Sequence, residues 1–182
     1  MWMLFRQLCA VAALPAVVTV VVPVWIARRN GIEFGAPADI ASASLQLVGA
    51  VALVIGGSLF GASLYYFWSR GRGTLAPWDP PRRFVVEGPY RFVRNPMISG
   101  VIFILVGEAA MLRSRPHAMW AMLFVLINAV YIPLLEEPQL AARFGDSYRE
   151  YRRHVRRFVP RVQPWSADSQ SVYLPRKHEN TK

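Results

Sequence analysis

The chain has 182 residues, of which 54% are hydrophobic, and a formal net charge of +10. Its apolar residues fall in long blocks, which excludes an ordinary soluble domain and indicates an integral membrane protein. Nearly all of its 21 basic residues lie between or after these blocks, so we attribute the charge to membrane orientation and lipid contact and expect no nucleic-acid partner.

The first apolar block covers residues 8–27 and is closed by Arg28 and Arg29. About 20 helical residues match a hydrocarbon core of roughly 30 Å, so this block predicts a membrane-spanning helix. No small-x-small cleavage site follows it, which argues against a signal peptide. Pro15 and Pro23 inside the block are expected to kink the helix, which membrane helices tolerate if neighbouring groups take up the freed carbonyls. Cys9, also in this block, is the single cysteine, so no disulfide or cysteine-based metal site is expected, and we predict no metal ion.

A loop is predicted at residues 30–44, where glycine and proline break the pattern, and a second span at 45–68. Small residues in this span allow close helix packing, namely Gly49, Gly56, Gly57, Gly61 and Ala62. The span ends in an aromatic group that we interpret as a membrane boundary, with cofactor stacking by Tyr65 or Trp68 as the alternative. Residues 69–86, rich in Arg, Gly and Pro, are predicted to form a loop over one membrane face.

The stretch at 87–97 places a Gly-Pro turn, two aromatic residues and two arginines directly before an apolar run. Asn95 is a favoured N-cap residue and Pro96 suits a first helical turn, so a helix is predicted to start at Pro96. Its first turn would offer free N–H groups and a positive dipole end to an anionic group, with Arg91 and Arg94 beside it. We therefore predict a polar site at a membrane surface.

Two further apolar runs, at 97–112 and 117–135, are separated only by residues 113–116. This short connection predicts an antiparallel helical hairpin. The run at 97–112 measures about 24 Å as a helix, which is short for a full crossing. Glu108 within it is costly to bury as an anion, so it is either a protonated or paired structural group or part of a polar path.

Four predicted spans place both termini on one side of the membrane. Of the basic residues, 17 lie on that side and four lie on the other, namely Arg28, Arg29, Arg113 and Arg115. By the positive-inside rule, the side with both termini is cytoplasmic. The predicted location is the inner or plasma membrane.

Beyond the last apolar run, Glu136 and Glu137 are followed by a helical pattern. Its apolar residues recur at spacings of three, four and three: Tyr148, Tyr151, Val155 and Phe158. Arginines fill the rest of this pattern, which predicts an amphipathic helix lying flat on anionic lipid. Residues 162–182 show no periodicity and are expected to be disordered.

The chain contains, in order, Gly88-Pro89-Tyr90, Val93-Arg94-Asn95-Pro96, a helical hairpin, Glu136-Glu137, Phe144-Gly145, Tyr148, Tyr151, and Arg161 after Pro160. This ordered set, over about half of the chain at residues 72–161, resembles the isoprenylcysteine carboxyl methyltransferase family and the related phospholipid methyltransferases. Asn95 stands where the family has a histidine that helps to hold the cofactor. Asparagine can donate and accept hydrogen bonds but does not titrate near neutral pH.

The resemblance implies a membrane methyltransferase that encloses S-adenosylmethionine between the last hairpin and the C-terminal segment. It implies catalytic roles for Arg94 and Glu137 and a cofactor site made of Gly88, Tyr90, Arg94, Asn95, Pro96, Glu136 and Glu137. Carboxylates can accept hydrogen bonds from the hydroxyls and the ammonium of the cofactor, and Arg94 can bind its carboxylate or orient an acidic substrate. The non-catalytic alternatives are a solvated Glu-Glu pair and an arginine bound to lipid phosphate.

We predict an all-α integral membrane protein with about four transmembrane helices, a C-terminal helical hairpin and an amphipathic cytoplasmic helix. It forms one domain over residues 1–161. The predicted activity is methyl transfer from S-adenosylmethionine to a lipophilic substrate, either the carboxylate of an isoprenylcysteine-like compound or a lipid headgroup amine, and anionic membrane lipid is a predicted partner. Two alternatives stay open: a membrane NADPH-dependent sterol or enone reductase, and a non-catalytic basic membrane-binding module.

Overall fold

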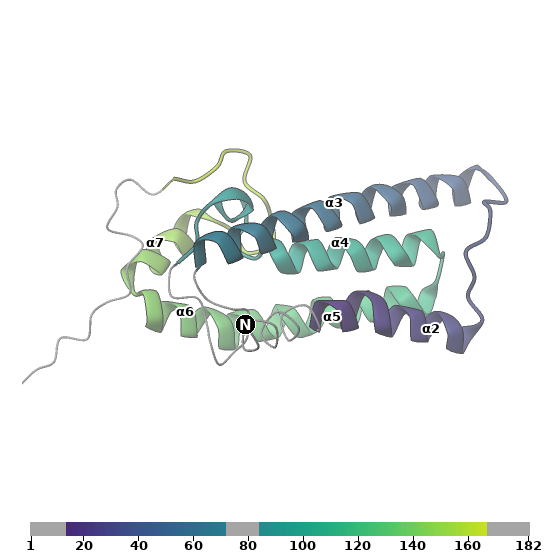
Figure 1. The fold of residues 1–182 in the computed structure, drawn as a ribbon, viewed down its shortest axis with the longest axis horizontal. Coiled ribbons are helices and arrows are strands. Elements are labelled where there is room, and N and C mark those ends of the chain that lie inside the picture. The colour runs from purple at the N-terminus through teal and green to yellow at the C-terminus, as the bar shows by residue number, and fades with distance from the viewer. Residues whose placement is uncertain (1–13, 72–83, 167–182) are drawn as a thin grey trace, which may run out of the picture. The chain divides into compact units, whose positions relative to one another are not determined.

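The computed structural model describes residues 14–71 and 84–166. Every regular element in these two ranges is helical (Figure 1), which confirms the all-α prediction for this part of the chain. In chain order the elements are η1 (Val17–Val21), α2 (Val22–Asn30), α3 (Ile40–Gly71), η2 (Gly88–Arg91), α4 (Pro96–Met111), α5 (Arg115–Tyr131), η3 (Ile132–Glu136), α6 (Glu137–Phe144) and α7 (Asp146–His154). The elements η1 and η3 are π-turns, and η2 is a 3-10 turn.

Two of the four predicted spans are helices long and apolar enough to cross a membrane, over Ile40–Tyr66 and Arg115–Phe144. The third, Pro96–Met111, is a shorter apolar helix, in line with the short run from which it was predicted. Of the first run, residues 8–13 lie outside the described residues, and the chain is helical from Leu14 to Asn30. Four complete spans therefore stay a prediction.

The chain divides into two compact units, which are described separately. Unit 1 comprises residues 1–61 and 97–128, and unit 2 comprises residues 62–96 and 129–182. Unit 1 contains η1, α2 and most of α3, α4 and α5. Unit 2 contains the end of α3 together with η2, η3, α6 and α7.

In unit 1, α3 and α4 pack backbone against backbone. A Cβ added to Gly56 would lie 2.7 Å from the carbonyl oxygen of Gly100, and one added to Gly49 would lie 2.9 Å from that of Gly107. The helices can approach this closely only because no side chain intervenes, which confirms the predicted packing role of these small residues. The prediction is wrong for two other glycines of α3, Gly57 and Gly61, because a Cβ on either would meet nothing within 4 Å among the described residues.

Pro23, the second of the two prolines inside the first predicted span, is compensated by a side chain of α5. The N–H of Val22 bonds to the carbonyl of Val17 at the end of η1. In that register the next donor would belong to Pro23, which has no N–H, so the carbonyl of Val18 is left free. The indole Nε1 of Trp120 donates to this oxygen at 3.0 Å. The expected compensation for a proline inside a span is therefore present.

The loop after α2 and the end of α4 are tied together. The side-chain amide of Gln46 donates to the carbonyl oxygens of Gly35, at 2.8 Å, and Met111, at 3.4 Å. Gly35 lies in the loop after α2, the helix that ends near Arg28 and Arg29. Met111 precedes the turn that carries Arg113 and leads to Arg115, and these four arginines are the ones predicted to lie on the non-cytoplasmic side. The two loops therefore lie at the same end of unit 1, as the predicted topology requires.

The helix α3 starts at Ile40, earlier than the predicted start at residue 45. The N–H of Ser42 donates to Oδ1 of Asp39 at 2.7 Å, and the N–H of Asp39 donates to Oγ of Ser42 at 3.1 Å. This reciprocal capping begins the helix at Ile40 and shortens the predicted loop. At its other end α3 continues to Gly71, so residues 69–71 are helical, while residues 72–83 of the predicted loop lie outside the described residues.

The last predicted span does not end at residue 135. Three elements, α5, η3 and α6, follow one another without a break up to Phe144, and the helical path passes through Glu136 and Glu137. Gly145, with φ 59°, ends α6, and α7 starts at Asp146. The two glutamates are thus inside the helical path rather than beyond its end.

The predicted amphipathic helix is shorter than expected, and its apolar face is covered by protein. The helix α7 ends at His154, because Val155 is extended with φ −111° and ψ 126°. Three residues of this face, Tyr148, Tyr151 and Val155, are buried in a cluster with Phe84 and Phe144. The ring centroids of Phe84 and Tyr151 are 5.0 Å apart. Aromatic packing within unit 2 covers the apolar face, so this face does not lie on lipid as an amphipathic surface helix would require. Contact of the arginines with anionic lipid stays a prediction.

The first part of the predicted tail is ordered. The N–H of Arg161 donates to the carbonyl of Phe92 at 2.9 Å, and the N–H of Trp165 donates to that of Arg91, also at 2.9 Å. In return, Nε of Arg91 donates to the carbonyl of Trp165 at 2.9 Å. The chain up to residue 166 is therefore held against η2, and residues 167–182 lie outside the described residues.

Candidate active site

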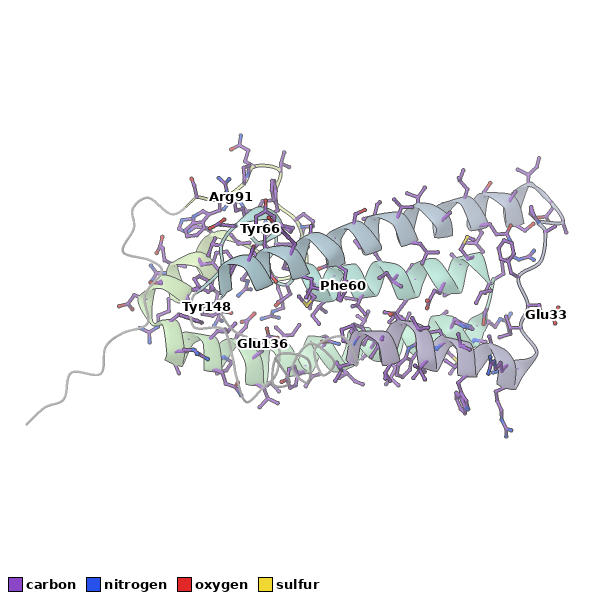
Figure 2. All side chains as sticks on the ribbon, in the orientation of Figure 1. Glu33, Phe60, Tyr66, Arg91, Glu136 and Tyr148 are labelled. Atoms are coloured by element: carbon purple, nitrogen blue, oxygen red, sulfur yellow. The ribbon has the colours of Figure 1, made fainter. Side chains whose placement is uncertain are left out.

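All predicted site residues lie in unit 2, on two stretches of the chain. One is η2 with the turn into α4, and the other is the junction of η3 and α6. Figure 2 shows side chains from both stretches, with Arg91 and Glu136 labelled. The residues concerned are Gly88, Tyr90, Arg94, Asn95, Pro96, Glu136 and Glu137.

The first stretch is a tight turn that leads into α4. Gly88 has φ +54°, and a Cβ on it would collide with the ring of Tyr66, so this position requires glycine on both conformational and steric grounds. The N–H of Val93 then closes a turn onto the carbonyl of Pro89 at 3.2 Å. The helix α4 starts at Pro96, which confirms the predicted start and puts Asn95 at the N-cap position.

The second stretch is shaped by a π-turn. The N–H of Glu137 bonds to the carbonyl of Ile132, five residues earlier instead of four. The extra residue rotates the following side chains about the helix axis by roughly 100° relative to an unbroken α-helix. Glu137 is buried, with 2% of its side chain exposed. Such turns often occur at functional sites.

Glu137 is the centre of a cluster of arginines. Its Oε1 lies 2.7 Å from Nε of Arg157 and 3.1 Å from Nη1 of Arg94. Its Oε2 lies 3.7 Å from Nε of Arg152. Arg94 is 10% exposed and Arg157 29%, whereas Arg152 is 55% exposed. The structure therefore brings Arg94 and Glu137 together, and the buried carboxylate is balanced by close cations.

Arg157 and Arg152 were not predicted as site residues, since their charges were assigned to a lipid-facing surface. Arg157 reaches Glu137 because the chain is extended after α7 and runs beside the first stretch. The N–H of Arg94 donates to the carbonyl of Arg156 at 2.9 Å, and the N–H of Asn95 donates to that of Arg157 at 3.3 Å. Pro160 restricts only the preceding Val159, so the sequence carries no clear signal for the break at Val155 that brings Arg157 to Glu137.

Three tyrosines lie in this region, of which Tyr148 and Tyr151 are buried and Tyr90 is half-buried. The hydroxyl of Tyr151 donates to the carbonyl of Tyr90 at 2.6 Å. Burial, with Glu136 nearby, raises the pKa of Tyr90. Burial raises the pKa of Tyr148 to about 12, and the Glu137 carboxylate adds to this rise. The phenols therefore stay protonated at neutral pH and cannot act as bases there.

Arg94 retains buried donors that lack a hydrogen bond. Among the described residues, neither its Nε nor its Nη1 has a hydrogen-bond partner, although Nη1 forms the ion pair with Glu137. A buried donor without an acceptor is costly, so an acceptor supplied by a ligand would be bound favourably. An anionic acceptor such as a ligand carboxylate suits this charged donor, because hydrogen bonds between ionised groups are the strong ones.

The charged side chains around Glu137 form ion pairs with one another. In the described part of the chain, no group of three or more His, Cys, Asp or Glu residues is placed to hold a metal ion. The hydrogen bond to Glu137 raises the pKa of Arg157, so this arginine stays charged. The site can thus bind a ligand that carries both a carboxylate and hydrogen-bond donors.

Comparison with known proteins gives a family and two relatives. The family model described as phospholipid methyltransferase matches residues 45–147. Methanethiol S-methyltransferase 1 of Bradyrhizobium diazoefficiens is 36% identical over 83 residues, which is 44% of this chain and 27% of that protein. Methanethiol S-methyltransferase 2 of the same organism is 38% identical over 76 residues, 40% of this chain and 27% of the relative. The matched part therefore spans about a quarter of either relative, and no solved structure matches the chain.

Proposed function

We propose that this chain, which belongs to the phospholipid methyltransferase family, is a membrane enzyme that transfers a methyl group from S-adenosylmethionine to a lipophilic acceptor. The family implies a methyl donor. The observation that carries the proposal is the buried Arg94, whose Nε has no hydrogen-bond partner among the described residues, beside the buried carboxylate of Glu137. Both residues lie within the region that matches the family model.

The residues fit the two polar ends of such a methyl donor. Arg94 would bind the carboxylate of its methionine part, and Glu136 and Glu137 would accept hydrogen bonds from ribose hydroxyls or from the ammonium. When bound, S-adenosylmethionine supplies a methyl group on a positively charged sulfur. The contribution of the protein is to bind, align and exclude water, since methyl transfer depends on geometry more than on an acid or base.

We propose an acceptor that is anionic when it reacts, either a carboxylate or a thiolate. Three arginines, Arg94, Arg152 and Arg157, lie close to Glu137, so positive charge exceeds the charge of the adjacent Glu136 and Glu137. This excess favours an anion over a lipid headgroup amine, whose methylated product is a cation. Both curated relatives are named for methyl transfer to the sulfur of methanethiol, which supports a thiol among the acceptors.

The proposed location is the inner or plasma membrane, with unit 2 and both termini on the cytoplasmic side. This orientation is supported by the 17-to-four distribution of basic residues. It is also supported by the hydrogen bonds of Gln46, which hold the loop after α2 and the loop after α4 at one end of unit 1. A cytoplasmic site would have access to soluble methyl donor and to substrates that partition into the bilayer.

The test is methyl transfer from methyl-labelled S-adenosylmethionine by purified protein in detergent or liposomes. The acceptors offered are a long-chain thiol, an isoprenylcysteine-like carboxylate and phosphatidylethanolamine. We expect labelled thioether or methyl ester, and loss of label with Glu137→Gln. Label in the phospholipid amine alone would contradict the anionic acceptor, whereas transfer to none of the three with no cofactor binding would contradict the methyltransferase. The family match supports methyl transfer over the reductase alternative.

A further inference from the structure

The two close contacts of Glu137 fall on the same oxygen. Oε1 receives the hydrogen bond from Nε of Arg157 at 2.7 Å and the ion pair with Arg94 at 3.1 Å. Oε2 lies 3.7 Å from Nε of Arg152, which is too long for a hydrogen bond. One oxygen of this buried carboxylate is therefore anchored, and Oε2, with no closer ion-pair contact among residues 14–71 and 84–166, retains capacity to accept.

The anchor is placed by the main chain and not by the ion pair itself. Val155 turns the chain out of α7 in an extended conformation. The N–H of Asn95 then donates to the carbonyl of Arg157 at 3.3 Å, so the Cα of Arg157 is held next to the turn that carries Arg94. Neither group of this backbone hydrogen bond belongs to the Arg157 side chain, so we expect a substitution of that side chain to preserve it.

We infer that Arg157 is a positioning residue for the methyl donor. By holding Oε1, its guanidinium fixes the rotation of the Glu137 carboxylate and leaves Oε2 to accept a hydrogen bond from a hydroxyl or ammonium of the ligand. Arg157 thus acts through Glu137 and does not contact the ligand. The inference rests on the proposed function and adds a residue that lies beyond the matched region at 45–147.

A positioning role and a direct binding role give different double-mutant cycles. If Arg157 acts only through Glu137, its replacement matters in the parent and not in a chain that already lacks the carboxylate. If Arg157 contacts the ligand, the two losses add. A general loss of folding would instead lower the unfolding temperature without ligand in proportion to the loss of affinity.

The experiment measures the dissociation constant of S-adenosylhomocysteine by calorimetry on detergent-solubilised full-length protein. The variants are Arg157→Gln, Arg157→Lys, Glu137→Gln and the double variant Arg157→Gln/Glu137→Gln. The control is Arg153→Gln, which removes one charge from an exposed arginine that pairs with Glu150 at 3.4 Å. The unfolding temperature of each apo variant is recorded alongside.

We expect Arg157→Gln to weaken binding about tenfold, the low end for a charge-assisted hydrogen bond. Arg157→Lys should recover part of this loss, the control should stay within twofold of the parent, and the double variant should equal Glu137→Gln. Additive losses, an Arg157→Gln value within twofold of the parent, or losses that follow the unfolding temperature would each overturn the positioning role. A parent that binds no S-adenosylhomocysteine would overturn the proposed function as well, so the two failures are distinguishable.

Discussion

The ring of Tyr66 lies against Gly88, so closely that a Cβ on this glycine would collide with it. Gly88 also has φ +54°, a conformation that costs other residues about 1–2 kcal/mol. The contact joins the end of α3 to η2 within unit 2. The shape of η2, which carries the first half of the site, thus depends on the lack of a side chain at Gly88.

Gly88→Ala should therefore destabilise the protein and weaken cofactor binding together. The matched control is Gly31→Ala, since Gly31 also has positive φ but nothing within 4 Å of its Cβ position. We expect the loss in unfolding free energy for Gly88→Ala to exceed that of the control by about 1–3 kcal/mol, the usual cost of overpacking. Thermal unfolding in detergent measures the stability of the two variants, and calorimetry with S-adenosylhomocysteine measures their cofactor binding. Equal losses of stability would show that the Tyr66 contact does not make Gly88→Ala more destabilising than the control.

A second pair of variants tests the packing of α3 on α4. Gly56→Ala places a methyl group 2.7 Å from the carbonyl oxygen of Gly100, a backbone atom that cannot move aside alone, so we expect a loss of about 1–3 kcal/mol. Gly57→Ala, one residue along, meets open space and should be neutral or stabilise the helix by up to about 1 kcal/mol. The unfolding temperatures of the two variants measure this difference. An unfolding temperature for Gly56→Ala equal to or above that of Gly57→Ala would contradict the described packing.

Alkaline pH should destabilise unit 2 through its buried phenols. The pKa of Tyr148 rises from 10.0 to about 12 on burial, so the folded state favours the neutral phenol. Its contribution is fully present below about pH 10 and is lost as pH rises through about 12. Unfolding temperatures measured between pH 8 and pH 11.5 should fall for the parent and fall less for Tyr148→Phe. Parallel curves for the two proteins would show that Tyr148 does not contribute.

Membrane orientation is tested with reporter fusions. The 17-to-four asymmetry of basic residues predicts that alkaline phosphatase fused after Lys182 is inactive and that the same reporter fused after Arg115 is active, because the enzyme folds only outside the cytoplasm. A fusion to a cytoplasmic reporter should give the opposite pattern and serves as the control. Activity after Lys182 combined with inactivity after Arg115 would reverse the assignment.

Local chemistry predicted several features correctly. The start of α4 at Pro96 follows from Asn95 and Pro96 alone, because capping and proline geometry act within one turn. The close approach at Gly56 follows from residue size, and a donor for the carbonyl freed by Pro23 follows from the cost of leaving it unpaired. These features follow from the local sequence, without knowing which distant residue makes each contact.

The features that were missed depend on tertiary contacts or on capping residues. Helical spacing showed that Tyr148, Tyr151 and Val155 share a face, but spacing cannot say whether protein or lipid covers that face. Arg157 reaches Glu137 only because the chain leaves α7 at Val155. The start of α3 at Ile40 is indicated in the sequence by Asp39 and Ser42, which form a reciprocal cap.

The central claim is that Arg94 and Glu137 form part of a binding site for S-adenosylmethionine. Its most direct test is calorimetry of purified, detergent-solubilised protein with S-adenosylhomocysteine and, separately, with NADPH. We predict that S-adenosylhomocysteine binds and NADPH does not, and that Glu137→Gln weakens the binding by roughly 10- to 150-fold, the range for loss of a charge-assisted hydrogen bond. Binding of NADPH alone, or an affinity for S-adenosylhomocysteine that stays within twofold of the parent in folded Glu137→Gln and Arg94→Ala variants, would contradict this account.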